Sequence, residues 1–186
     1  MRPLDIITRY YDPSTRAFRI LREHGELVAE RSLKAAARVG HLKPDLAFIR
    51  DAAMLHDIAI FLTDSPGIGC HGAEPYVRHG ILGRDILDAL GMPSHGLVCE
   101  RHVGVGISAE DIRCFNLPLP VRDMRPVTIE EQIICYADKF FSKINNQSEH
   151  TLVEVLADLA RYGQDKVERF LAWHEVFTGK ARNSKR

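Results

Sequence analysis

A histidine and an aspartate stand side by side in an otherwise apolar stretch, Met54-Leu55-His56-Asp57-Ile58-Ala59. Apolar residues recur around this pair at helical spacing, at Leu46, Ile49, Ala53 and Ile60. His56 falls on the same helical face, so we expect its side chain in the protein interior. Burying a carboxylate beside it is unfavourable unless the carboxylate is paired or bound to a cation. The pair therefore predicts a helical core built around a polar centre, with a metal ion as its simplest partner.

The rest of the chain also predicts helices. They are expected at residues 15–39, 44–62, 76–90, 94–102, 128–144, 148–162 and 164–178. Ser94 is expected to cap one of them, and Thr128 and Glu131 have the spacing of a capping box. No segment shows the alternation of a half-buried strand. With 186 residues, 45% of them apolar, the chain can bury one core, so we predict an all-α, single-domain helical bundle.

The same patterns divide the chain into four parts. Residues 1–15 are predicted to form an N-terminal arm and residues 16–145 the main domain. Residues 146–178 are predicted to form two amphipathic helices that pack on this domain. Residues 179–186 contain four basic residues and no apolar pattern, so we predict a disordered basic tail.

Composition and charge argue against several classes of partner. The 25 basic and 25 acidic residues cancel, so neither nucleic acid nor an anionic membrane is expected as the main partner. No run approaches the roughly 20 apolar residues of a membrane span. The four cysteines, Cys70, Cys99, Cys114 and Cys135, have no C-x-x-C spacing, and the N-terminus lacks an apolar signal core. We therefore expect reduced thiols in a cytoplasmic protein; the patterns indicate no particular oligomeric state.

Six residues of metal-ligand type lie on or beside the apolar faces of five predicted helices. They are His24, His56, Asp57, His79, His102 and Asp138. A single histidine on an apolar face is more often a hydrogen-bonded core residue than a ligand. Burying all six without a cation would leave several polar groups uncompensated, at about 1–3 kcal/mol or more each. The set therefore indicates a buried metal site.

The order His, His-Asp, His, His, Asp resembles the HD-domain superfamily of metal-dependent phosphohydrolases, in the subgroup named for a His-Asp-Ile-Gly (HDIG) motif. The resemblance covers about residues 20–145 and implies an HD-type bundle with the metal site in its core, residues 16–145 forming the metal-binding domain. It implies that a first metal ion is bound by His24, His56, Asp57 and Asp138. It also implies that His79 and His102 bind a second ion, with Asp57 bridging.

The sequence departs from this subgroup at two positions. Ala59 stands where the subgroup has glycine, a change that we expect to be harmless. Ile60 stands where several members have a lysine or glutamate that assists the chemistry. The group that contacts the phosphate or donates a proton is therefore unassigned by the resemblance.

Imidazole and carboxylate ligands suit divalent transition metals, and with four histidines we expect one or two ions, with iron or manganese favoured. Two such ions activate a bridging water and hold phosphoryl oxygens. Asp57 is the central catalytic candidate. His71, in the glycine-rich segment 63–75, and Lys139, beside Asp138, are candidates for the missing helper. The alternatives are an exposed or ligand-orienting role for His71 and an ordinary surface lysine at position 139.

Other charged residues are expected at the surface. Glu100 and Arg101, beside His102, are predicted to be an exposed pair. Arg113, Arg122 and Arg125 flank a proline-rich segment and either gather around a polyanion or are scattered surface residues.

The leading hypothesis is a phosphohydrolase that acts on a small phosphorylated substrate, a nucleotide or another phosphate ester. A di-iron oxygenase could use the same histidine and aspartate ligands, because some HD-domain proteins are oxygenases of that kind. A third possibility is a catalytically silent domain that binds a nucleotide. The ligand pattern by itself does not separate these three.

Overall fold

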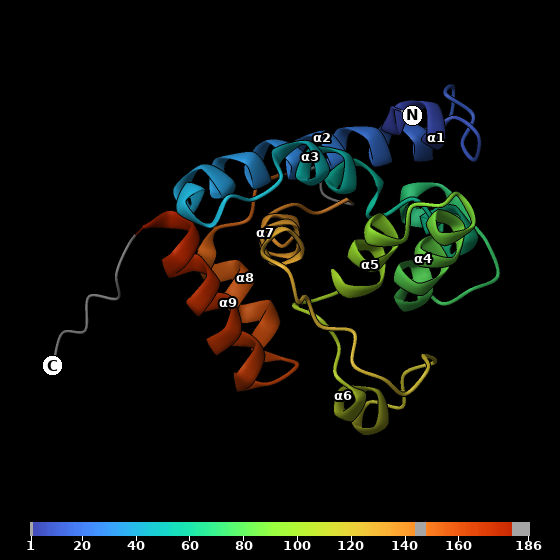
Figure 1. Cartoon of the computed structure of the whole chain (residues 1–186). Helices are drawn as coiled ribbons and strands as arrows, with labels where there is room; N and C mark the ends of the chain where they lie inside the picture. Colours follow the sequence, from blue (N-terminus) through green and yellow to red (C-terminus); the bar gives the residue numbers. More distant parts are fainter. Residues whose placement is uncertain (1, 144–147, 180–186) are drawn as a thin grey trace, which may run out of the picture.

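The computed structural model describes residues 2–143 and 148–179, and most of these residues are helical (Figure 1). The helices are α1 (Pro3–Ile7), α2 (Arg16–Arg38), α3 (Leu46–Leu55), α4 (His79–Ala89), α5 (Pro93–Arg101), α6 (Ala109–Cys114), α7 (Ile129–Asp138), α8 (Leu152–Ala160) and α9 (Gln164–Thr178). Short 3-10 turns are η1 (Gly40–Leu42), η2 (Ile60–Leu62), η3 (Pro66–Ile68) and η4 (Tyr76–Arg78). The all-α prediction is therefore confirmed.

A two-residue hairpin interrupts the glycine-rich segment that follows Asp57. Strand β1 (Asp64–Ser65) pairs antiparallel with β2 (Cys70–His71). Gly72 makes the return possible, because a Cβ there would lie 2.0 Å from the backbone of Leu62. The segment is thus an ordered loop held close to the end of η2.

Helix α7 lies in the middle of the molecule, with α2 and α3 along one side of it (Figure 1). Helices α8 and α9 lie to one side of α7 and α4 and α5 to the other, while α6 stands apart at one end. One apolar cluster combines residues of α2, α3, α7, α8 and α9. A second combines α1 with the start of α2, the end of α3 and part of α4. The bundle therefore has two apolar cores that meet along α2 and α3.

His24 and His56 lie where the chain passes from one apolar cluster to the other. In α2, Leu21 belongs to the second cluster and Val28 to the first, with His24 between them. In α3, Ala53 belongs to the first cluster and Leu55 to the second. The polar centre expected from the sequence consequently lies at the seam between the two cores.

Helix starts follow ordinary capping chemistry, but the sequence interpretation was wrong at two positions, Glu131 and Ser94. The hydroxyl of Thr128 accepts from the backbone N–H of Glu131 at 3.2 Å, as predicted. The Glu131 carboxylate, however, accepts from the N–H of Val127 and not from that of Thr128. The prediction that Ser94 caps α5 was wrong, because Pro93 already occupies the first turn and Met92 is the cap residue.

Two helices end earlier than predicted. Helix α3 ends at Leu55, with His56 as its C-cap, whereas the periodicity predicted a helix to residue 62. Consecutive residues in a continuous helix point about 100° apart, so ending the helix here allows His56 and Asp57 to face one centre. Helix α7 ends at Asp138 and not near residue 144, which lies outside the described residues.

The N-terminal arm is part of the core. Ile6 and Ile7 of α1 are fully buried. The Tyr11 hydroxyl donates to the carbonyl of Ile58 at 2.8 Å and accepts from the N–H of Phe61 at 3.1 Å. The arm thereby fixes the turn that carries Asp57. The tail predicted to be disordered lies outside the described residues except for Gly179.

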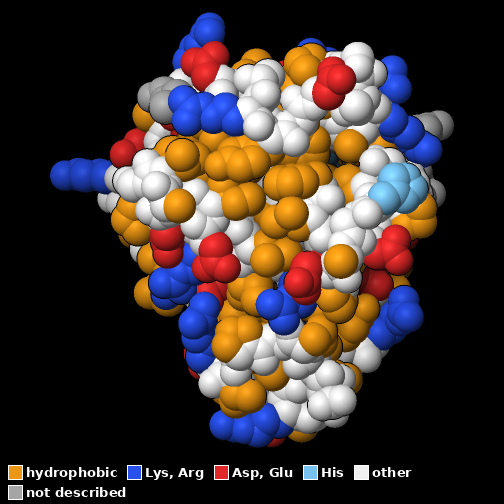
Figure 2. All heavy atoms as spheres, turned by 90° about the vertical axis from the view of Figure 1, so that its right-hand side faces the viewer, with side chains coloured by type: hydrophobic (Ala, Val, Ile, Leu, Met, Phe, Trp, Pro, Cys, Tyr) orange, Lys and Arg blue, Asp and Glu red, His pale blue; other side chains and the backbone are white. Residues whose placement is uncertain are grey.

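The face formed around α1 and α4 carries hydrophobic side chains across its middle, with charged groups around them (Figure 2). Partly buried residues that pack against the second cluster include Ile86, Leu90 and Met92.

Within residues 2–143 and 148–179, no helix combines the length and apolarity needed to cross a bilayer. All four cysteines are free thiols.

We predict that Tyr11→Phe lowers the free energy of unfolding by about 1–3 kcal/mol, because the buried carbonyl of Ile58 loses its donor. Urea denaturation monitored by circular dichroism measures the change. Tyr10→Phe is the matched control, and we expect it to change stability by less than about 0.5 kcal/mol. Equal effects of the two substitutions would contradict the role given to the Tyr11 hydroxyl.

Candidate metal centre

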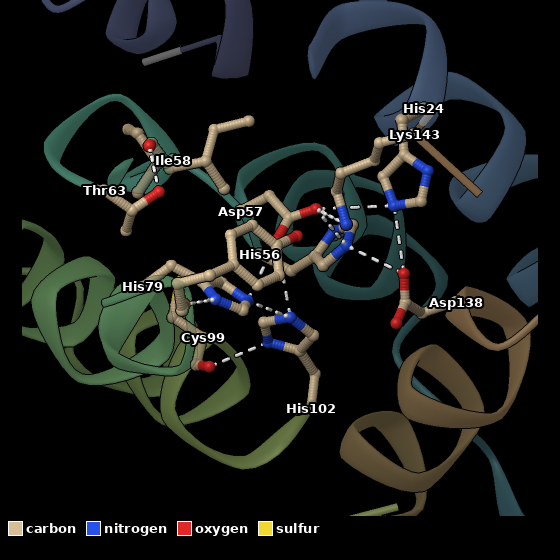
Figure 3. Close-up of polar contacts among 12 residues, drawn as sticks. His24, His56, Asp57, Ile58, Thr63, His79, Cys99, His102, Asp138 and Lys143 are labelled. Atoms are coloured by element: carbon tan, nitrogen blue, oxygen red, sulfur yellow. Dashed lines mark hydrogen bonds and ion pairs between the residues drawn. The ribbon is translucent and has the colours of Figure 1, made fainter. Parts of the chain in front are cut away.

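The structure brings together all six residues that the sequence singled out (Figure 3). One ligand atom from each of His24, His56, Asp57 and Asp138 lies within 4.8 Å of the others. Asp57, His79 and His102 form a second such set. The six side chains are buried, and Asp57 belongs to both sets.

Most of these six side chains belong to residues at the ends of helices. His56 and His102 are the C-cap residues of α3 and α5, His79 is the first residue of α4, and Asp138 is the last of α7. His24 alone among the six lies in the middle of a helix, α2. Side chains at helix ends can converge from different directions without the helices themselves having to cross at one point. This arrangement gathers six polar groups from five parts of the chain.

Three of the histidines are oriented by backbone carbonyls in the same way. The Nδ1 atom of His56 donates to Ala53 O at 2.6 Å, that of His79 to Tyr76 O at 2.6 Å, and that of His102 to Cys99 O at 2.8 Å. Since a carbonyl only accepts, each Nδ1 carries the proton. The Nε2 atom of each ring faces the cluster and is the atom that can bind a metal, which for His56 requires loss of the Nε2 proton.

The contact between His79 and His102 favours a cation at this place. Their Nε2 atoms are 3.1 Å apart. Because both Nδ1 atoms donate to carbonyls, two neutral rings would oppose two lone pairs across this gap. A cation bound by both nitrogens removes the repulsion. The donor set of the second cluster therefore fits a metal ion.

The first cluster contains buried polar atoms that the protein leaves without hydrogen bonds. Among the described residues, Asp57 Oδ1, Asp57 Oδ2 and His56 Nε2 have no hydrogen-bond partner. Their close neighbours are ionisable groups at 3.1 to 3.5 Å, together with the ammonium of Lys143, whose Nζ lies 2.6 Å from Asp57 Oδ2. Lys143 pairs with Oδ2 only, whereas Asp57 Oδ1 faces His79 and His102 at 3.3 and 3.5 Å; a buried carboxylate oxygen of this kind is satisfied by cation coordination. The residues present thus fit a divalent metal ion.

Lys143 is a site residue that the sequence interpretation missed. Its side chain comes from the segment that follows α7 and reaches into the cluster beside His24 and Asp57 (Figure 3). On a continuous helix it would lie about 140° around the axis from Asp138, because each residue adds about 100°. The early end of α7 at Asp138 makes its inward direction possible. Periodicity along the chain contains no signal for this.

The pKa values in the cluster reflect burial and charge together. Burial lowers the pKa of His24 to about 4 and that of His79 to about 3, and both rings are therefore neutral at pH 7. For His56, burial acts in the same direction, but the carboxylates of Asp57 and Asp138 outweigh it and raise the pKa to about 10. Neutral imidazole is the form that binds metal ions.

Burial alone would raise the pKa of both aspartates, yet the positive charges of His56 and Lys143 hold the pKa of Asp57 and of Asp138 well below its usual value. For Lys143, burial opposes the charged form, but Asp57 raises its pKa above the ordinary value. Both carboxylates are therefore ionised, and the chain itself supplies two positive charges to face them.

The cluster opens into a cavity of about 750 Å³. His79, His102, Asp138 and Lys143 contribute to its wall, and Lys139 lies beside them. The ring of Tyr76 packs over His79 with 4.5 Å between ring centroids. A cavity of this size admits a substrate of nucleotide dimensions.

The other candidates from the sequence lie in different places. His71 is exposed in β2, opposite Asp64, and is not part of the cavity wall; its catalytic role stays a prediction without geometric support. Ile60 is fully buried in the second apolar cluster, so it has no access to a substrate.

Glu100 and Arg101 were wrongly predicted to be an exposed pair. Glu100 is only 4% exposed and pairs with Arg84 and Arg122. Arg101 donates to both carboxylate oxygens of Glu131 at 2.9 Å. A carboxylate buried at the end of α5 needs cations around it, and arginines from α4 and from the proline-rich segment provide them. These three ion pairs hold the end of α5, which carries His102, in place.

Comparison with solved structures identifies the fold. The chain has the HD-domain fold: it matches the HD domain of the L. monocytogenes phosphodiesterase PgpH with a TM-score of 0.55 and 15% identity, over 95% of this chain and 96% of that one. The same domain in complex with cyclic-di-AMP matches with a TM-score of 0.55 and 14% identity, over 99% and 98% of the two chains. The all-α bundle with its buried histidine and aspartate cluster is thus of HD-domain type.

Three characterised or catalogued proteins are similar to this chain in sequence. The chain is 34% identical over 119 residues to the uncharacterized protein MJ0778 of Methanocaldococcus jannaschii, covering 62% of this chain and 63% of that protein. It is 33% identical over 115 residues to a tRNA (cytidine(56)-2'-O)-methyltransferase of Picrophilus torridus, covering 61% of this chain and 30% of the enzyme. A methyltransferase of the same name from Thermoplasma volcanium is 29% identical over 136 residues, with 72% and 36% covered. The matches thus span less than two thirds of each of these relatives, and no family model matches.

The position of Asp57 in both ligand sets leads to a prediction about metal content. We expect Asp57→Ala to lose nearly all bound divalent metal and His79→Ala to lose about half of it, as elemental analysis of protein purified without chelator would measure. Asp64→Ala, in the exposed β1 strand, is the control and should keep the full content. Unchanged metal in the His79 variant would contradict the assignment of a second ion.

Proposed function

We propose that this protein is a metal-dependent phosphohydrolase that cleaves a phosphate ester of a nucleotide or another small molecule. The observation that carries the proposal is the pair of overlapping ligand sets, joined by Asp57, whose members His79, His102 and Asp138 line one cavity. Iron and manganese are the favoured metals, because four imidazoles and two carboxylates suit them better than magnesium.

When bound, divalent ions supply an activated water and positive charge for the phosphoryl oxygens. His24, His56 and Asp138 would hold the first ion, His79 and His102 the second, with Asp57 shared. The Nδ1 hydrogen bonds of His56, His79 and His102 fix their rings, so that little reorganisation is needed when the site is filled.

Lys143 supplies a positive charge in place of the helper residue that several members of the HDIG subgroup have at the position of Ile60. Its ammonium lies in the cavity wall beside Asp57, where a phosphoryl group bound at the cluster would meet it. A fixed cation in a buried site stabilises negative charge that develops during phosphoryl transfer. Lys143, and not the exposed His71, is therefore the group that we assign to the phosphate oxygens.

The PgpH HD domain in complex with cyclic-di-AMP supports a nucleotide-like substrate for this protein as well. Both chains share the same fold over nearly their full lengths. The cavity size is compatible with a ligand of this class.

Anaerobic assays on protein loaded with Mn²⁺ or Fe²⁺ test the proposal. Nucleoside monophosphates, linear and cyclic dinucleotides and p-nitrophenyl phosphate esters are the substrates, with product formation followed by chromatography or absorbance. We expect hydrolysis of at least one ester that requires metal and is abolished in Asp57→Ala. Turnover that proceeds only with O₂ would instead identify an oxygenase, and binding without any turnover would identify a silent domain.

We predict that Lys143→Met lowers kcat/KM by about 100-fold, the usual effect of removing one stabilising group for a developing anion, while the metal content is retained. Steady-state kinetics and elemental analysis of the same preparation measure the two quantities. Lys34→Met is the matched control, since the Lys34 side chain is 73% exposed and its one ion pair within the described part of the chain is with Glu30 in its own helix. Unchanged kcat/KM in Lys143→Met would rule out this role.

A further inference from the structure

A second cavity, of about 440 Å³, adjoins the cavity over the metal cluster. We call it the side chamber. Both cavities are bounded by the same residues along one side, namely Tyr76, Val103, Gly104, Lys139 and Asp158. Val103 and Gly104 directly follow His102, so the chamber begins next to the ligand cluster. A molecule bound at the cluster can therefore extend into it.

The side chamber is apolar and partly aromatic. Val105, Ile107 and Leu117 line it, with Phe115 and Tyr162 at its outer part. The rings of Phe115 and Tyr162 meet edge to face at 6.4 Å between centroids, and each side chain is 50% exposed. Two half-exposed aromatic rings beside an apolar cavity form a surface on which a further aromatic ring can pack.

Charge inside the side chamber is already neutralised. Asp111 and Lys166 both line it and pair with each other at 2.5 Å. Asp158, at the junction with the larger cavity, lies 3.5 Å from Arg161. Lys139, also at the junction, forms no ion pair with the described residues, which leaves its ammonium available to an anion. Positive charge thus lies between the cavities, and apolar surface lies beyond it.

This arrangement matches a molecule with a phosphate at one end and an aromatic ring at the other. On the basis of the proposed phosphohydrolase function, we propose that the side chamber binds the base of a nucleotide substrate while its phosphate lies at the His/Asp cluster. Phe115 and Tyr162 stack on the base, and Lys139 pairs with the phosphate or with a neighbouring one. Stacking of this kind accepts any base, because every base has an aromatic face.

Binding without turnover tests the proposal. The probes are adenosine 5′-phosphonate and the matching ribose phosphonate that lacks the base, whose P–C bonds are not hydrolysed. Isothermal titration calorimetry on Mn²⁺-loaded protein measures both dissociation constants. We expect the base to tighten binding by about 10-fold or more, which corresponds to about 1.4 kcal/mol.

The variant Phe115→Ala with Tyr162→Ala should reduce this gain to about threefold or less and leave the binding of the base-free phosphonate unchanged. Because both side chains are half exposed, their removal should leave the fold intact, which circular dichroism verifies. Val153→Ala, at a position that is 75% exposed and lines neither cavity, is the control and should keep the full gain.

Two results would overturn the proposal: a base that adds no affinity, and a gain that survives in the double variant. Octyl phosphonate that binds as tightly as adenosine 5′-phosphonate would also overturn the proposal, since the side chamber would then bind an alkyl chain as well as a base. The assay is independent of catalysis, so a base preference without hydrolysis would uphold the side chamber and refute only the phosphohydrolase function. Hydrolysis without a base preference would do the opposite.

Discussion

Burial of Asp57 is the constraint on which the rest of this structure depends. A carboxylate with no exposed surface must be compensated by positive charge or hydrogen bonds, and its own backbone turn provides neither. Four imidazoles, a second carboxylate and the Lys143 ammonium surround Asp57. They come from α2, α3, α4, α5 and the end of α7. Helices α3 and α7 end at Leu55 and Asp138 because of that requirement. The boundary between the two apolar cores has the same cause.

Much of the fold and most of the candidate site could be predicted from the sequence, because buried residues recur at helical spacing along it. The six ligand-type residues lie on apolar helix faces, which indicated that they point inward, and the order of their types indicated an HD-type bundle. The structure brings all six together. The helices themselves were predicted with the correct type and approximate positions, since amphipathic spacing is a local property.

What could not be predicted depends on contacts between distant parts of the chain. Periodicity continues smoothly through His56 and Asp57, so it does not indicate that α3 stops to let both side chains face one centre. Glu100 looks like a surface residue in its helix, and its burial is explained only by Arg84 and Arg122, which come from other segments. Lys143 likewise gains its role from the fold of the chain after α7.

The Lys143 ammonium also affects how the charge of Asp57 is balanced while the chain folds. Two ionised aspartates in a closing core would oppose folding if only an external ion could balance them. With an internal cation 2.6 Å from Asp57, the newly synthesised chain carries its own temporary counter-ion. The folded chain thus balances the charge of Asp57 from within, and under the proposed function a divalent ion would compete with Lys143 for the Asp57 carboxylate.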